Sequence, residues 1–244
     1  MHRRLFAIYK WSVVAPFLAM STFVIGSTVI VFSLARMPDF ASRVFGTLWA
    51  RLNMIVSMIG IDVVGADKVD RKQSYVIVAN HQSLIDIYVL YGYLGVDIKW
   101  VMKKELRAVP VLGMACEMMG HILIDRSNTA AALDSINEAR HKIANGISIV
   151  FFAEGTRSRT GELRVFKKGA FRLAQELELP VLPVTIHNTR YVLPSDTMDL
   201  MPGRVTLEFN DPIPTTGLTP GDVPTLASRT REIIRRSLEG EEQI

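Results

Sequence analysis

The feature that most constrains this chain is a run of 25 residues without a charged side chain, from Trp11 to Ala35. As a helix rising about 1.5 Å per residue, the run would extend roughly 37 Å, and a bilayer's hydrocarbon core is about 30 Å thick. Arg3, Arg4 and Lys10 precede it, and the positive-inside rule places such residues in the cytoplasm. The sequence predicts attachment to a membrane at its cytoplasmic face, which is the inner membrane if the source is bacterial.

Two other interpretations of the run stay open. A cleaved signal peptide would use Ser33 and Ala35 as its small-residue cleavage site, although the run exceeds the roughly 7–15 residues of a signal core. A buried core helix is the third possibility. A second apolar stretch with helical spacing follows at about 42–60, and it either forms a hairpin with the first or packs on the rest of the protein. We therefore expect residues 1–61 to form a membrane-attaching two-helix segment.

Charge and cysteine content narrow the class of protein further. The net charge is +4, and residues 1–60 hold six basic residues against one acidic residue. Basic residues concentrated in the most apolar segment indicate an anionic membrane surface as partner and argue against a nucleic-acid binder. The single cysteine, Cys116, excludes an internal disulfide, and no Cys/His cluster predicts a metal site.

From residue 62 onward, apolar runs rich in β-formers alternate with helical patterns. The expected strands lie at 75–79, 98–102, 121–124, 147–152, 181–186 and 204–209, and the expected helices at 84–94, 110–119, 128–145, 169–178 and 223–239. This alternation is typical of an α/β domain with a mostly parallel sheet flanked by helices. We expect residues 62–244 to form one catalytic domain of this class.

Polar residues follow four of the expected strands, at the point where each strand ends. These segments are 80–83, 103–104, 125–127 and 154–158. Because ligands of open α/β sheets bind outside the carboxyl ends of the strands, the four segments are expected to meet at one edge and form a site.

Within the first segment, His81 and Asp86 have the spacing H-x-x-x-x-D. If His81 lies in the turn and Asp86 in the first helical turn, the carboxylate can orient the imidazole and leave its other nitrogen as a base. The alternative is that Asp86 caps the helix together with Ser83. No G-x-S-x-G elbow supplies a protein nucleophile, so the base would act on a substrate hydroxyl.

Arg126 and Arg157 each follow an expected strand, and arginine makes bidentate contacts with phosphate. Lys104 is a further candidate cation. The alternative for each is an ordinary solvated side chain. The Glu154-Gly155-Thr156 segment, which precedes Arg157, brings backbone groups and a hydroxyl to the same place.

Five motifs occur together in a fixed order: NHQSLID (80–86), KKEL with Pro110 and Gly113, GHILIDR (120–126), FAEGTRS (152–158) and LPVLPVTI (179–186). In this set the chain resembles the glycerolipid acyltransferases, and within them the 1-acyl-sn-glycerol-3-phosphate (lysophosphatidic acid) acyltransferases. The resemblance covers about residues 75–190. One departure is Ala153, where the family usually has proline.

The resemblance implies that His81 is the general base and Asp86 its partner, and that Arg126 and Arg157 hold the acceptor phosphate with help from Lys104. It also implies that Glu154, Gly155 and Thr156 shape the acceptor pocket. The reaction would move a fatty acyl group from acyl-CoA or acyl carrier protein to the sn-2 hydroxyl of lysophosphatidic acid, giving phosphatidic acid in phospholipid biosynthesis, without a cofactor or a metal.

We expect the donors that stabilise the oxyanion among the backbone amides of the 80–83 turn or of the helix start. Three rival functions stay open. The acceptor can be another lysolipid, such as a lyso-ornithine lipid or a lysophospholipid; water can replace the acceptor, as in a thioesterase; or the chain can be a non-catalytic lipid-binding protein.

Overall fold

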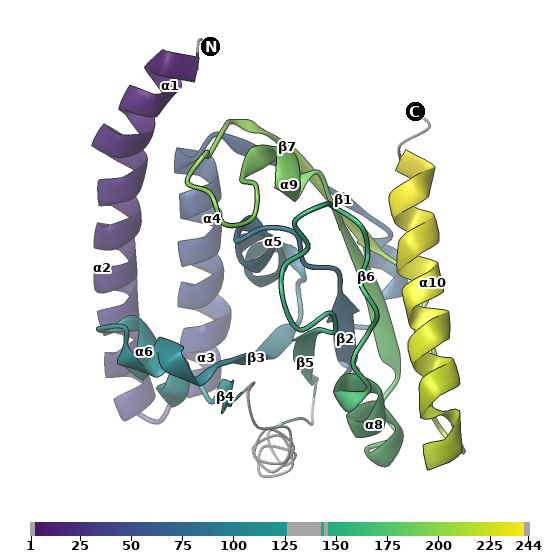
Figure 1. Cartoon of the computed structure of the whole chain (residues 1–244). Helices are drawn as coiled ribbons and strands as arrows, with labels where there is room; N and C mark the ends of the chain where they lie inside the picture. The colour runs from purple at the N-terminus through teal and green to yellow at the C-terminus, as the bar shows by residue number, and fades with distance from the viewer. Residues whose placement is uncertain (1–2, 126–142, 144–145, 242–244) are drawn as a thin grey trace.

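The computed structural model describes residues 3–125, 143 and 146–241 (Figure 1). Its centre is a sheet with the strand order β1-β7-β6-β2-β5-β3-β4. Neighbouring strands pair in parallel, except that β6 and β7 are antiparallel. The predicted α/β class with a mostly parallel sheet is confirmed.

The strands are β1 (Ile59–Val64), β2 (Val76–Ala79), β3 (Asp97–Lys103), β4 (Ile122–Ile124), β5 (Ile147–Phe152), β6 (Val181–His187) and β7 (Gly203–Phe209). The helices are α1 (Arg3–Tyr9), α2 (Ala15–Leu34), α3 (Pro38–Ala41), α4 (Thr47–Val56), α5 (Ile85–Tyr93), α6 (Leu112–Met118), α8 (Gly169–Glu176), α9 (Thr189–Val192) and α10 (Val223–Glu241). Each of the six strands expected from sequence is present. The helix expected at 128–145 falls almost entirely outside the described residues.

The central strand β2 contributes to a core on each face of the sheet. Val76 and Val78 pack with residues of α8 and α10, whereas Ile77 and Ala79 pack with residues of α4 and α5. Side chains of a strand alternate between faces, so a strand covered on both sides is a continuous apolar run. All four residues are fully buried, which fixes the carboxyl end of β2 and the turn after it.

Residues Arg3–Leu34 form one continuous helix, in which a π-helical turn at Lys10–Val14 joins α1 to α2. This helix lies beside α4 (Figure 1). The two are joined by a hydrogen bond from Trp49 Nε1 to Thr22 Oγ1 (3.0 Å) and one from Asn53 Nδ2 to Ser21 Oγ (3.0 Å). The expected pair of adjacent apolar helices is therefore present.

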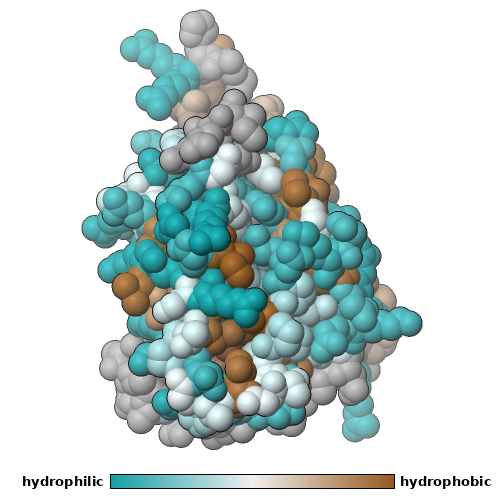
Figure 2. Space-filling view, turned by 90° about the vertical axis from the view of Figure 1, so that its right-hand side faces the viewer, coloured by the Kyte–Doolittle hydropathy of each residue, from teal (hydrophilic) through white to brown (hydrophobic). Residues whose placement is uncertain are grey.

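Most of the apolar side chains of this N-terminal helix are not covered by protein. Only 17% of its most apolar window is buried, and the helix is long and apolar enough to cross a membrane. Its exposed large side chains are Leu5, Ile8, Trp11, Val13, Met20, Phe23, Val24, Val31 and Leu34. A core helix would be mostly buried, so this interpretation of the run is wrong. By contrast, the side covered by α10 is mostly hydrophilic, with smaller apolar patches (Figure 2).

The second apolar helix ends earlier than its pattern indicates. The expectation extended to about residue 60, but α4 stops at Val56 and strand β1 begins at Ile59. The chain reverses at Met58, which has φ 56°. The apolar spacing simply continues through Ile59, so it hides the change from helix to strand. Strand β1 therefore lies across the boundary that the sequence indicated between residues 61 and 62.

Candidate active site

The turn after β2 is anchored to the neighbouring strand β6 by Asn80. Its side chain is fully buried; Nδ2 donates to the Ile186 carbonyl and Oδ1 accepts from the Ile186 amide, both at 2.8 Å. Asn80 thus replaces the backbone pairing that β2 would need to continue. The next residue, His81, starts from a fixed position at the carboxyl edge of the sheet.

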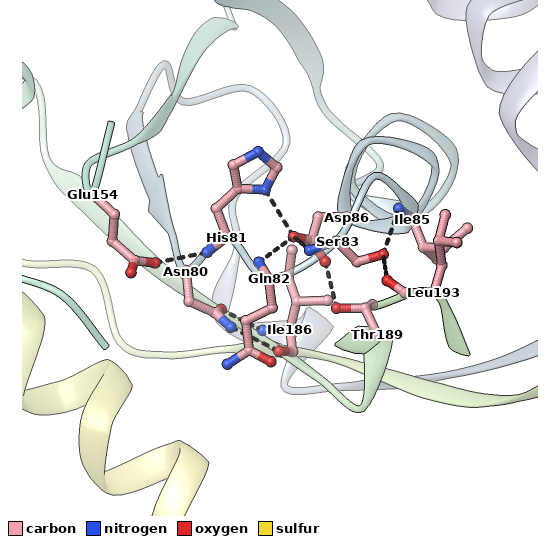
Figure 3. A network of polar contacts seen from close by, with 10 residues as sticks. All are labelled: Asn80, His81, Gln82, Ser83, Ile85, Asp86, Glu154, Ile186, Thr189 and Leu193. Atoms are coloured by element: carbon pink, nitrogen blue, oxygen red, sulfur yellow. Dashed lines mark hydrogen bonds and ion pairs between the residues drawn. The ribbon is translucent and has the colours of Figure 1, made fainter. Parts of the chain in front are cut away.

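His81 and Asp86 meet as the sequence predicted. Nδ1 of His81 lies 2.8 Å from Oδ2 of Asp86, which sits in the first turn of α5 (Figure 3). An ionised carboxylate only accepts hydrogen bonds, so it fixes the proton on Nδ1 and leaves Nε2 as an acceptor. Nε2 points away from Asp86 (Figure 3).

Asp86 also caps the turn, so both interpretations of its spacing describe real contacts. Oδ2 accepts hydrogen bonds from the amides of Gln82 (2.7 Å) and Ser83 (2.9 Å), and Oδ1 accepts from Thr189 Oγ1 (2.5 Å). The side chain is 0% exposed. Since buried polar groups need hydrogen-bond partners, these contacts satisfy both oxygens of the Asp86 side chain in the interior.

The imidazole of His81 lies flat on the ring of Phe152, the last residue of β5. The ring centroids are 3.7 Å apart and the planes differ by 9°. Only 12% of the His81 side chain is exposed. Phe152 below and Asp86 at one edge therefore hold the ring in a single orientation.

Glu154 braces the loops around His81. Oε1 accepts from the His81 amide (2.8 Å) and Oε2 from the Arg164 amide (3.0 Å), so both carboxylate oxygens are used by backbone. Burial raises the pKa of the Glu154 carboxyl above its usual range, and the two backbone hydrogen bonds act in the opposite direction. Gly155 follows with φ 77°, a conformation that favours glycine, and a Cβ there would lie 2.7 Å from the Lys167 side chain.

The expected oxyanion donors in the turn are already engaged. The amide of His81 donates to Glu154, and those of Gln82 and Ser83 donate to Asp86. At the helix start, the Ile85 amide donates to Ser83 Oγ (3.1 Å). An amide N–H that already donates to a buried acceptor is not available to stabilise a transition state. The expectation is therefore wrong for these four amides, because the same carboxylate that orients His81 consumes two of them.

Arg157 lies on the loop after β5, next to His81 along the sheet edge. The Ser158 amide donates to the His81 carbonyl (2.8 Å), which joins this loop to the turn after β2. Arg157 lines a polar cavity of about 510 Å³, called here the arginine cavity. Its lining residues are Thr156, Arg157, Ser158, Arg159, Thr160, Glu162, Leu163, Arg164, Ser195 and Asp196. Thr156 and Arg157, which are adjacent in sequence, thus both line this cavity.

The two other predicted cations are placed differently. Lys104 follows β3, and its Nζ donates to Asp125 Oδ2 (2.5 Å) at the end of β4. Its side chain is half exposed. Because β3 and β4 are neighbours, this pair belongs to the same sheet edge as His81, but the charge partner of Lys104 is an acid of the protein itself. Arg126 lies outside the described residues.

A second cavity, of about 220 Å³ and almost wholly apolar, opens between the N-terminal helix and the α/β domain. We call it the apolar cavity; its lining residues are Lys10, Trp11, Val14, Ala15, Leu18, Asn53, Met54, Ser57, Ile59, Leu84, Ile85, Tyr88, Leu193, Met198 and Leu200. Leu84 and Ile85 directly follow the His81–Ser83 turn. The turn that carries His81 is therefore joined to the lining of both cavities: Ser158 of the arginine cavity donates to the His81 carbonyl, and Leu84 and Ile85 of the apolar cavity follow the turn.

Several functional contacts were not predicted from sequence. Thr189 lies 103 residues from Asp86 and comes into contact with it because the end of β6 adjoins the end of β2. Phe152 begins the motif at 152–158, but the sequence pattern marks it only as the end of a strand. Asp196, which contacts Arg157 (3.2 Å) and Arg159 (2.6 Å), lies in a loop without a chemical pattern. Among the described residues, no group of three or more His, Cys, Asp or Glu is placed to hold a metal ion.

Sequence comparisons with known proteins point to acyltransferases. The Acyltransferase family model matches residues 60–187, more than half of the chain. Human 1-acyl-sn-glycerol-3-phosphate acyltransferase alpha is 34% identical over 174 residues, which is 71% of this chain and 62% of that protein. The 1-acyl-sn-glycerol-3-phosphate acyltransferase of Cocos nucifera is 30% identical over 207 residues, covering 83% of this chain and 67% of the relative.

The fold has a close counterpart among solved structures. The 1-acyl-sn-glycerophosphate (LPA) acyltransferase PlsC from Thermotoga maritima superposes with a TM-score of 0.78, at 24% sequence identity, over 98% of this chain and 96% of that one. The chain spans about three fifths of the length of its mammalian relatives. The family match and these relatives carry the same conclusion as the ordered motifs: the chain belongs to the acyltransferase family.

Proposed function

We propose that this protein transfers a fatty acyl group from an acyl thioester to the sn-2 hydroxyl of 1-acyl-glycerol-3-phosphate, producing phosphatidic acid. The relatives named above are acyltransferases of this specificity. The observation that carries the proposal is the 2.8 Å contact between His81 Nδ1 and Asp86 Oδ2, with Nε2 facing away from the carboxylate. A base prepared in this way acts on a hydroxyl group.

The proposed reaction proceeds by addition and elimination. Nε2 of His81 takes the proton of the sn-2 hydroxyl while its oxygen attacks the thioester carbonyl carbon. The tetrahedral intermediate collapses, the carbon–sulfur bond breaks, and the departing thiolate receives the proton from the imidazolium. Asp86 keeps the proton on Nδ1 throughout and stabilises the positive charge on the ring.

The two cavities fit the two ends of the acceptor. Arg157 and its neighbours in the arginine cavity offer guanidinium groups and hydroxyls to a phosphate. The apolar cavity, on the other side of the His81 turn, offers an environment for an acyl chain. A lipid with a phosphate at one end and a chain at the other thus places its hydroxyl near His81.

We further propose that the reaction takes place at the cytoplasmic surface of a membrane. The N-terminal helix presents its apolar side chains outward, and burying such surface is favourable by about 25 cal/mol per Å². Trp11, Val14 and Leu18 of this helix also line the apolar cavity. Removal of the helix as a signal peptide would take away one wall of that cavity, which supports its retention.

The test is an assay of the purified full-length protein in detergent with 1-acyl-glycerol-3-phosphate and either acyl-CoA or acyl carrier protein thioester. Wild type should release thiol and form phosphatidic acid. Replacing His81 by Ala should lower kcat by at least about 10²–10⁴-fold. The variant His81→Gln keeps an amide that can donate to Asp86 but offers no base, so it should be as inactive as His81→Ala.

The products decide between the proposal and its rivals. Free fatty acid in place of phosphatidic acid would identify a thioesterase, and product with other lysolipids alone would identify a different acceptor. No turnover by wild type with either donor would favour a non-catalytic lipid-binding protein. Folded His81→Ala with turnover near that of wild type would remove His81 as the base.

A further inference from the structure

The two arginines of the loop after β5 already hold an anion, and that anion belongs to the protein. Arg157 Nη2 lies 3.2 Å from Asp196 Oδ1, and Arg159 Nε lies 2.6 Å from Asp196 Oδ2. Each carboxylate oxygen thus has its own guanidinium. A carboxylate shared between two guanidinium groups matches the way that arginines grip the oxygens of a phosphate.

Asp196 also lies in the cavity that the proposed function assigns to the acceptor phosphate. It lines the arginine cavity together with Arg157, Arg159 and Arg164. Among the charged residues of that lining, three arginines face two acids, so the carboxylate of Asp196 cancels much of the available positive charge. A phosphate that binds to Arg157 must therefore replace the carboxylate or remain beside it and be repelled.

The ion pairs of Asp196 with Arg157 and Arg159 contribute little to the stability of the fold and can exchange with solvent. The side chains of Asp196 and Arg159 are 45% and 79% exposed and that of Arg157 is 28% exposed, and ion pairs open to solvent contribute little to stability. Asp196 has φ 60°, a left-handed conformation that aspartate and asparagine tolerate better than most residues. A half-exposed carboxylate beside an accessible cavity lets a doubly charged phosphate exchange with a singly charged carboxylate.

The segment that carries Asp196 borders both cavities. Its residues Leu193, Met198 and Leu200 line the apolar cavity, whereas Ser195 and Asp196 line the arginine cavity. Ser83 Oγ donates to the Leu193 carbonyl (2.7 Å) and Lys10 Nζ to the Met198 carbonyl (2.7 Å). Release of Asp196 therefore removes both ion pairs that join this stretch to the loop after β5, next to the expected position of the acyl chain.

We propose that Asp196 is an intramolecular competitor of the acceptor phosphate: it occupies Arg157 and Arg159 in the empty enzyme and is displaced when a phosphomonoester enters the arginine cavity. This inference rests on the proposed function, because it takes the arginine cavity as the acceptor's phosphate subsite. Asp196 acts on acceptor binding and not on the chemical step, so it sets KM and leaves kcat unchanged.

The first experiment compares acceptor kinetics of three full-length variants with wild type. Asp196→Asn keeps the shape and tolerates the backbone conformation but loses the charge, so KM for 1-acyl-glycerol-3-phosphate should fall by about 2- to 10-fold at unchanged kcat. Asp199→Asn removes one negative charge from the same exposed segment and should leave KM unchanged. Arg157→Ala should raise KM at least about tenfold.

These variants separate failure of the inference from failure of the proposed function. If Arg157→Ala raises KM but Asp196→Asn leaves it unchanged or raises it, Asp196 orients the arginines and the inference is overturned alone. If Arg157→Ala has no effect on KM, the arginine cavity is not the phosphate subsite, and the inference falls with that part of the proposed function. An equal decrease of KM in Asp199→Asn would point to long-range charge and also overturn it.

A second measurement uses wild type alone and does not depend on the folding of a variant. Glycerol 3-phosphate, which carries the phosphate without the acyl chain, is added to the purified protein, and amide hydrogen exchange is followed by mass spectrometry. Exchange in residues 195–199 should increase as the phosphate displaces Asp196. Unchanged or slower exchange in this stretch at saturating glycerol 3-phosphate would contradict displacement.

Discussion

The histidine–aspartate pair and the arginine cavity adjoin each other, yet the protein holds them in opposite ways. Asp86 is fully buried, and its two oxygens accept four hydrogen bonds from within the domain. Arg157 and Arg159 extend from a loop toward a half-exposed carboxylate on another loop. A base must keep one orientation during the reaction, whereas a phosphate subsite must admit and release its ligand. The comparison predicts large effects for changes on the buried side and small ones on the exposed side.

The largest effect is expected for Asp86→Asn. The amide cannot accept all the hydrogen bonds that the two oxygens of Asp86 accept, and it no longer fixes the proton on His81 Nδ1. We expect kcat to fall by about 10²–10⁴-fold with little change in KM. Steady-state kinetics measures this, with circular dichroism to verify folding. A kcat within threefold of wild type would show that the orientation of His81 does not depend on this carboxylate.

Thr189→Val should have the next largest effect. It removes the hydroxyl that donates to Asp86 Oδ1 (2.5 Å) and leaves a buried carboxylate oxygen without that partner. Hydrogen bonds to charged groups contribute about 1.5–3 kcal/mol, so the free energy of unfolding should fall by about this amount. Urea denaturation provides the measurement. Thr189→Ser is the matched control, since it keeps the hydroxyl, and equal losses in the two variants would assign the effect to packing.

The raised pKa of Glu154, on the buried side, predicts that the stability of the fold depends on pH. Burial raises the pKa of its carboxyl from the usual 4.5, so the folded protein keeps this proton at pH values where the unfolded chain has lost it. The contribution of Glu154 to stability is thus full below the unfolded-state pKa and is lost as pH rises through the folded-state pKa.

Replacing Glu154 by Gln should remove this loss of stability with rising pH, which wild type shows in its free energy of unfolding above about pH 4.5. The variant should also lose about 1–2 kcal/mol at every pH, because its amide nitrogen cannot accept one of the two backbone hydrogen bonds. Urea denaturation from pH 4 to pH 8 tests both effects. Glu162→Gln, at an exposed position of the same loop, is the control; parallel curves for wild type and Glu154→Gln would refute the linkage.

The smallest effect is expected for Lys104→Ala on the exposed side. Lys104 is half exposed and pairs with Asp125, and exposed ion pairs of this kind change little when removed. We expect KM for 1-acyl-glycerol-3-phosphate to rise less than about threefold. Lys103→Ala provides the baseline for loss of one neighbouring charge. An increase above tenfold for Lys104→Ala alone would place this side chain on the acceptor phosphate and weaken the contrast between the two sides.

Patterns of neighbouring residues predicted the features that depend on neighbouring residues, such as strands, helices and the turn after β2. Strand and helix positions followed from apolar periodicity, and the His81–Asp86 contact followed from a spacing of five residues across a turn and a helix start. Contacts such as Thr189 with Asp86 depend on which strands lie side by side, and periodicity does not specify strand order. The early end of α4 was missed because the apolar spacing continues into β1.

Electrostatic partners were the least predictable part of the site. Arg157 and Lys104 were identified as cations that follow strands, but their acidic partners Asp196 and Asp125 lie 39 and 21 residues away. A sequence reveals the charge of a side chain and not which opposite charge it meets. The role of Glu154 as a brace between backbone amides was hidden for the same reason, since backbone donors carry no sequence signature.

The flat stacking of His81 on Phe152, with centroids 3.7 Å apart, places an aromatic face against the ring that carries positive charge during the proposed reaction. The face of an aromatic ring carries negative electrostatic potential, which attracts a cation placed over it by about 0.5–2 kcal/mol. In the proposed reaction the imidazole becomes cationic directly above that face. Phe152 thus acts as an uncharged counterpart to the carboxylate at the ring's edge, and it offers no atom that competes for the proton.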